Sequence, residues 1–108
     1  MISIVLVTML LAAANPSDPP RKAYLQCLDQ FLRKSLEEKM KPDDFEKALA
    51  PACADKEGTL KKVAIDYDVK DGVPRKDAEQ YISEEIGDFQ SNIRIMYREY
   101  FDTNSKPS

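Results

Sequence analysis

The chain has 108 residues, with 16 Lys and Arg, 19 Asp and Glu and no His, which gives a formal net charge of −3 at pH 7. This length allows one domain at most, and the mild acidity with interspersed signs excludes a nucleic-acid-binding footprint and a polybasic membrane-surface helix. Without His, neither a Ser-His-Asp triad, a Cys-His pair nor a His-based metal site can form. The composition indicates a small soluble protein, and we expect no cofactor and no enzymatic activity.

Residues 1–14 are predicted to be a signal peptide. They form an uncharged apolar run that ends in Ala12-Ala13-Ala14, an A-x-A-like cleavage site. The run is shorter than the roughly 20 apolar residues of a transmembrane helix, so no stable membrane span is expected after its removal. Because no Lys or Arg precedes the run, an uncleaved anchor and a wrongly assigned start codon remain alternatives. We expect an exported protein, periplasmic or secreted.

Residues 15–20 are predicted to be a Pro-rich spacer, and residues 21–102 a helical domain. The first helix is expected from Arg21 to Met40, because apolar residues recur there at three- and four-residue spacing. Lys41-Pro42 is expected to end it, since proline biases the preceding residue away from the helical region. The apolar stripe consists of Tyr24, Leu28, Phe31, Leu32, Leu36 and Met40.

The second helix is predicted to start at Pro42 and to end at Asp71-Gly72, where glycine can adopt the left-handed cap conformation. Pro51 interrupts its apolar stripe, so a kink or a break is expected there. The stripe resumes at Leu60, Val63, Ala64 and Tyr67.

The two cysteines, Cys27 and Cys53, are predicted to form a disulfide. Cys27 lies fourteen residues before Lys41 and Cys53 twelve after it. At a rise of about 1.5 Å per residue they are about 21 and 18 Å from the turn, nearly the same height in an antiparallel pair. Two cysteines in an exported chain also favour pairing, and closing this loop is worth on the order of 3 kcal/mol. The alternative, two buried free thiols, applies if the chain is not exported.

The third helix is predicted to open at Pro74 and to carry a short coiled-coil-like seam. The seam consists of Ile82, Ile86, Phe89, Ile93, Met96 and Tyr100. Residues 103–108 are expected to form a polar tail, and no segment alternates with period two. The predicted fold is therefore all-α: a disulfide-stapled antiparallel helical hairpin plus a long third helix, in a small three- to four-helix bundle.

A candidate interaction surface follows from the lengths of these helices. A straight second helix would extend about ten residues, roughly 15 Å, beyond the start of the first helix. The third helix returns alongside, so part of an apolar face is left uncovered, as at a dimer or partner surface. The alternative is that the chain folds back near Pro51 or Gly58 and buries this face. The candidate residues are Leu60, Val63, Tyr67, Tyr81 and Ile82.

Two further patterns in the sequence bear on metal binding and on acid–base catalysis. The string from Asp66 to Gly72 resembles the start of a calcium loop, but its register is wrong for the ligand and glycine positions, and no metal site is predicted. Carboxylate pairs such as Glu84-Glu85 lie on faces expected to be solvated, so an enzyme of carboxylate chemistry is only a further alternative.

The aromatic cluster near the C-terminus is expected to pack over the end of the first helix and the start of the second, with a ligand or partner patch as the alternative. The cluster consists of Met96, Tyr97, Tyr100 and Phe101, and the residues beneath it of Leu36, Met40 and Phe45.

Two resemblances bear on function. The apolar leader, the two-cysteine hairpin and the string Asp68 to Glu79 resemble a family of small exported two-cysteine helical proteins of proteobacteria, which implies location and fold but no activity. The segment Ala52 to Lys56 is locally similar to the second cysteine region of acid-activated periplasmic chaperones of the HdeA type, although their cysteine separation is longer and their helix order differs. We therefore expect a protein- or peptide-interaction module, able to form a homodimer, with an acid or envelope-stress chaperone as the alternative.

Overall fold

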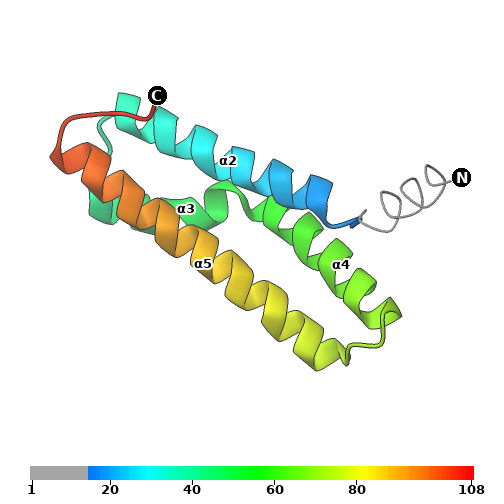
Figure 1. The fold of residues 1–108 in the computed structure, drawn as a ribbon. Coiled ribbons are helices and arrows are strands. Elements are labelled where there is room, and N and C mark those ends of the chain that lie inside the picture. Colours follow the sequence, from blue (N-terminus) through cyan, green and yellow to red (C-terminus); the bar gives the residue numbers. More distant parts are fainter. Residues whose placement is uncertain (1–14) are drawn as a thin grey trace, which may run out of the picture.

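The computed structural model describes residues 15–108, which form four α-helices and no strand (Figure 1). The helices are α2 (Asp18–Glu37), α3 (Pro42–Ala52), α4 (Ala54–Lys70) and α5 (Arg75–Asp102). The all-α fold is as predicted. The predicted signal peptide, residues 1–14, lies outside the described residues.

Helix α2 starts and ends earlier than predicted. It begins at Asp18, so Pro19 and Pro20 belong to its first turn, where proline is tolerated. It ends at Glu37 because Lys39 takes a left-handed backbone conformation (φ 56°). The Met40 N–H then donates to the Ser35 carbonyl oxygen at 3.0 Å and closes the turn. This is a helix-ending motif usually built around glycine. Because the helix already ends at Glu37, the predicted end at Lys41-Pro42 is wrong.

The predicted second helix is split into α3 and α4 at Cys53. Pro51 lies in the last turn of α3, where its ring cannot continue the helix. Cys53 itself has φ −118° and ψ 23°, outside the helical region, and is buried. Its side chain forms the predicted disulfide with Cys27 of α2, with a Cα–Cα distance of 6.0 Å. The disulfide therefore fixes α2 at the junction where the chain changes direction.

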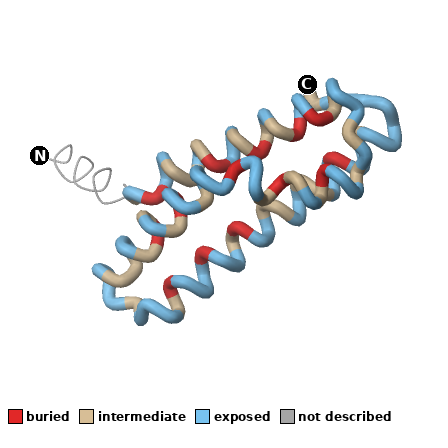
Figure 2. Tube along the Cα trace, turned by 180° about the vertical axis from the view of Figure 1, so that it is seen from behind, coloured by how far each residue is buried: buried red, intermediate tan, exposed pale blue. Residues whose placement is uncertain are grey.

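The long helix α5 packs against α2, α3 and α4 and supplies one wall of the core (Figure 2). The predicted seam needs one correction: Met96 is 39% exposed, and its neighbour Tyr97 is fully buried. The observed seam repeats after 11 residues, or about 3.67 residues per turn, close to a straight helix rather than a heptad. Its members are Ala78, Ile82, Ile86, Phe89, Ile93, Tyr97 and Tyr100.

Helices α4 and α5 form a hairpin that extends past the start of α2 (Figure 1). The turn between them uses Gly72 at φ 94°, as predicted for the helix end. The Val73 N–H donates to the Asp68 carbonyl oxygen at 2.9 Å and completes the cap. Part of the candidate face is buried, as the fold-back alternative expected, because Leu60 and Ile82 lie in the core, while the hairpin itself extends past α2.

Candidate interaction surface

The structure divides the five predicted surface residues into two layers. Leu60 and Ile82 are buried between α4 and α5, and Val63 is half-buried. Tyr67 and Tyr81 are exposed, with 36% and 55% of their residue surface accessible. Of the five residues, the two tyrosines are therefore the exposed ones, whereas Leu60 and Ile82 belong to the core.

One small residue of this hairpin, Ala78, was missed by the sequence reasoning, whereas Ala64 belonged to the predicted apolar stripe. Ala64 of α4 and Ala78 of α5 are buried in the hairpin. Small side chains allow two helix backbones to approach closely, so they form part of the seam although they contribute little to hydrophobic periodicity. Ala64 lies four residues after Leu60, and Ala78 lies four residues before Ile82. This spacing is the signal that places each alanine on the same helix face as its buried neighbour.

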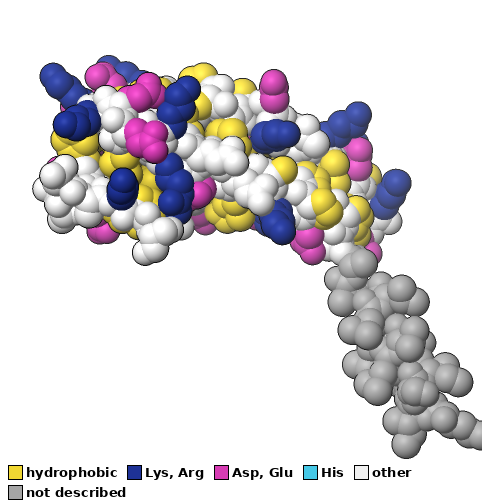
Figure 3. Space-filling view, turned by 90° about the horizontal axis from the view of Figure 1, so that it is seen from above, with side chains coloured by type: hydrophobic (Ala, Val, Ile, Leu, Met, Phe, Trp, Pro, Cys, Tyr) yellow, Lys and Arg dark blue, Asp and Glu magenta, His cyan; other side chains and the backbone are white. Residues whose placement is uncertain are grey.

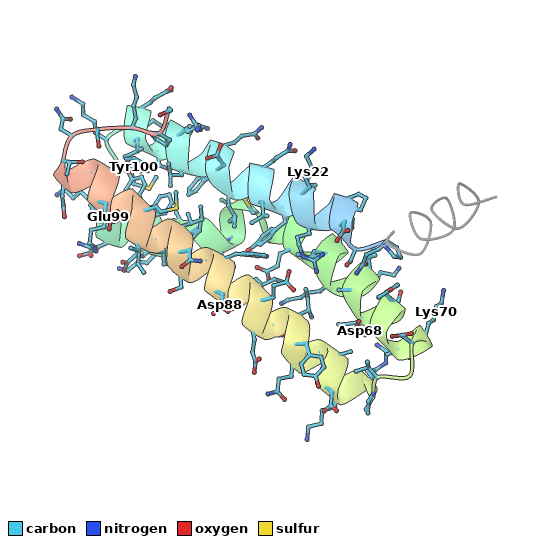
Figure 4. All side chains as sticks on the ribbon, viewed as in Figure 1. Lys22, Asp68, Lys70, Asp88, Glu99 and Tyr100 are labelled. Carbon is cyan, nitrogen blue, oxygen red and sulfur yellow. A yellow bond between two sulfur atoms is a disulfide. The ribbon has the colours of Figure 1, made fainter. Side chains whose placement is uncertain are left out.

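The calcium-like string lies on the same hairpin but does not form a loop. Asp66 and Asp68 belong to α4, and Asp71 and Gly72 form its cap (Figure 4). Within residues 15–108, no group of three or more His, Cys, Asp or Glu side chains is arranged to hold a metal ion. The string therefore serves as a helix end.

A polar network crosses the core between α2, α4 and α5. The Gln90 side-chain amide donates to the Tyr24 hydroxyl oxygen at 3.0 Å and to a Glu57 carboxylate oxygen at 2.9 Å. Lys61 pairs with the same carboxylate group at 3.1 Å. Burial raises the pKa of Tyr24 above its ordinary value, so its hydroxyl stays protonated. The network satisfies a buried hydroxyl and contains no activated nucleophile.

Helix α5 also makes every inter-helix ion pair of the described residues. Arg21 of α2 pairs with Glu85, and Arg98 pairs with Asp43 and Glu46 of α3 at 3.1 and 3.3 Å. The hydrogen bond with Glu85 raises the pKa of Arg21, and hydrogen bonds with Asp43 and Glu46 raise that of Arg98. Charge therefore links α5 to α2 and α3, while the disulfide links α2 to the α3–α4 junction.

In the aromatic cluster at the other end of α5, Tyr97 packs in the core as expected, whereas Met96 and Phe101 are exposed. The Tyr97 ring stacks on Phe45 with a centroid distance of 3.8 Å, and Phe45 in turn stacks on Phe31 at 5.4 Å. The Tyr97 hydroxyl donates to the Met40 carbonyl oxygen at 2.6 Å. Burial raises the pKa of Tyr97 above its ordinary value. Tyr97 thus ties α5 to the turn between α2 and α3.

No family model, curated protein or solved structure matches this chain. Among the helices of residues 15–108, none combines the length and the hydropathy needed to cross a membrane. Charged side chains of both signs are interspersed with apolar ones on the face shown in Figure 3.

Proposed function

We propose that this protein is a small non-enzymatic interaction module of an oxidising compartment, periplasmic or secreted, that binds a protein or peptide through the α4–α5 hairpin. The observation that carries the proposal is the exposure of Tyr67 and Tyr81 on the hairpin that extends past α2. The Cys27–Cys53 disulfide supports the compartment, because such bonds persist where the surroundings are oxidising.

Tyrosine is suited to this role for a physical reason. Its ring supplies a large apolar area at a low cost in conformational entropy, and its hydroxyl remains able to bond at a wet rim. Both side chains project from α-helices rather than from loops, so a partner would meet a preorganised surface. Helices α4 and α5 pack against each other, and Leu60 of α4 and Ile82 of α5 are buried in the core.

Site-specific photo-crosslinking in the native compartment tests the proposal. A photoreactive phenylalanine analogue would replace Tyr81 in one variant and Ile95, 55% and 57% exposed respectively, in the control. Both positions lie on α5, but Ile95 is far from the hairpin turn. We expect a discrete adduct from position 81 alone, lost when Tyr67 is replaced by Ser.

The adduct mass separates the possible occupants. A second copy of this chain gives twice the monomer mass, and analytical ultracentrifugation of the purified protein would then show a dimer. A different mass identifies a distinct partner, whose affinity for Y67S and Y81S variants can be measured directly. Equal adducts at positions 81 and 95, or none at 81, would contradict the proposal.

An acid-activated chaperone is the second candidate, favoured by the distribution of the ion pairs. Every inter-helix pair within residues 15–108 includes α5, whereas the disulfide holds α2 to the α3–α4 junction. Below about pH 3 carboxylates are protonated, which removes these pairs and leaves the 16 Lys and Arg charges to repel one another. Acid would then release α5 from a stapled remainder and expose the core face.

Light scattering of an aggregating client protein at pH 2–3 tests this second candidate. Protection by the oxidised protein, with a rise in apolar dye binding as the pH falls, is the expected result. The same protein at pH 7 is the control. Absence of protection at pH 2–3 removes the chaperone candidate and leaves the hairpin proposal untouched.

A further inference from the structure

A cavity of about 460 Å³ lies at the opposite end of the molecule from the α4–α5 turn. It is formed by the end of α2, the end of α5 and the residues that follow α5 (Figure 4 labels Tyr100 there). Its lining includes the apolar residues Leu36, Tyr100 and Phe101 and the two lysines Lys39 and Lys106. Its volume is within the range of small-molecule sites.

The segment after α5 forms one wall of this cavity, so the predicted polar tail, residues 103–108, is not a free extension. The Ser105 N–H donates to the Tyr100 carbonyl oxygen at 2.9 Å and turns the chain back toward α2 (Figure 1). Arg33 of α2 then donates to the carbonyl oxygens of Pro107 and Ser108 at 3.4 and 3.2 Å. The tail is thus fastened across the ends of two helices.

Two residues of the lining have an unusual backbone conformation. Lys39 (φ 56°) and Asn104 (φ 52°) are the non-glycine residues with positive φ in the described part of the chain, and both line the cavity. Each follows a helix end, where glycine is preferred and where α4 uses Gly72. A non-glycine residue in this conformation lowers the stability of the fold by on the order of 1 kcal/mol relative to glycine. We therefore infer that the side chains of Lys39 and Asn104 have a function.

The electrostatics of the cavity suit an anion. The carboxyl ends of two helices would repel one, but several carbonyl groups in the last turn of each helix already accept backbone hydrogen bonds. The Leu36 oxygen accepts from the Lys39 N–H at 3.1 Å, and the Phe101 oxygen from the Asn104 N–H at 3.2 Å. Glu37 is the single carboxylate of the lining against two lysines, so the balance is positive.

We propose that this cavity binds a small carboxylate with an apolar body, such as a medium-chain fatty acid. The body packs on Leu36, Tyr100 and Phe101, and the carboxylate accepts charge-assisted hydrogen bonds from Lys39 and Lys106. The Asn104 side-chain amide is a further donor in the same lining. This site lies apart from the hairpin surface and does not depend on its proposed function.

Titration calorimetry with decanoate, decylamine and decanol, below their aggregation concentrations, tests the proposal. The three probes share one chain and differ only in the head group. We expect saturable 1:1 binding of decanoate, with decylamine and decanol at least about tenfold weaker, because a charge-assisted hydrogen bond is lost. Lys106→Gln should weaken decanoate by about threefold or more, and Lys62→Gln, an exposed lysine outside the cavity, should leave it unchanged.

The variant Lys39→Gly distinguishes a ligand-binding role from a structural one. Glycine relieves the left-handed backbone, so the thermal midpoint should rise while decanoate affinity falls by at least about threefold. Equal affinity for decanoate and decylamine would overturn the proposal. So would a Lys39→Gly protein that is more stable and binds decanoate as tightly as the unmodified chain.

Discussion

Removing the disulfide is the perturbation whose magnitude the structure defines best. Cys27 and Cys53 close a loop with a sequence separation of 26 residues. The chain-entropy model assigns such a loop about 3.5 kcal/mol at 25 °C, because the cross-link restricts the unfolded chain. We therefore expect Cys27→Ala combined with Cys53→Ala to lower the free energy of unfolding by about that amount. Because Cys53 is buried, the missing sulfur adds a small packing loss.

Differential scanning calorimetry and urea titration measure the effect. For a domain of this size, about 3.5 kcal/mol lowers the thermal midpoint by about 14–28 °C. The urea m-value should increase, since the unfolded chain without the cross-link exposes more surface. Reduced unmodified protein is the control and should behave like the double variant. A midpoint change below about 5 °C with an unchanged m-value would refute the loop-entropy reasoning.

Three further predictions concern α5 and the helix ends. Tyr97→Phe should lower the free energy of unfolding, measured by urea titration, by about 1 kcal/mol, because the Met40 carbonyl loses a donor. Burial raises the pKa of Tyr97, so the stability that its hydroxyl confers is complete below about pH 10 and falls as the pH rises through the raised value. The Tyr97→Phe variant should therefore lose less stability at high pH than the unmodified chain. Gly72→Ala, at φ 94°, should destabilise the protein by about 1 kcal/mol, whereas Gly58→Ala, in α4 with open space at its Cβ, should stabilise it by about 0.5–1 kcal/mol. Equal effects of the two substitutions would contradict the backbone argument. A double-mutant cycle of R21Q and E85Q should give a coupling of at most about 1 kcal/mol that weakens in 1 M salt, because both side chains are partly exposed.

The candidate surface shows what an apolar sequence pattern can and cannot predict. Helix lengths predicted a hairpin that extends past the first helix, and the structure has one. The pattern alone could not separate Leu60 from Tyr67, because both belong to one apolar stripe. Which of them faces α5 depends on the rotation of α4 about its axis, and packing with the neighbouring helix sets that rotation. For the other end, the sequence offered a ligand patch at the aromatic cluster only as an alternative. The cavity itself could not be predicted, since its wall is a tail held by Arg33 from a distant part of the chain.

The helices, the disulfide and the glycine cap could all be predicted from the sequence. Apolar residues at three- and four-residue spacing specify an amphipathic helix wherever it packs, and Gly72 relieves a backbone strain that is local to its own turn. The tertiary structure alone decided the break at Cys53 rather than a kink, the burial of Tyr97 in place of Met96, and the left-handed ending at Lys39. In each of these, contacts between segments distant in sequence selected among backbone and side-chain states that differ by only about 1–3 kcal/mol.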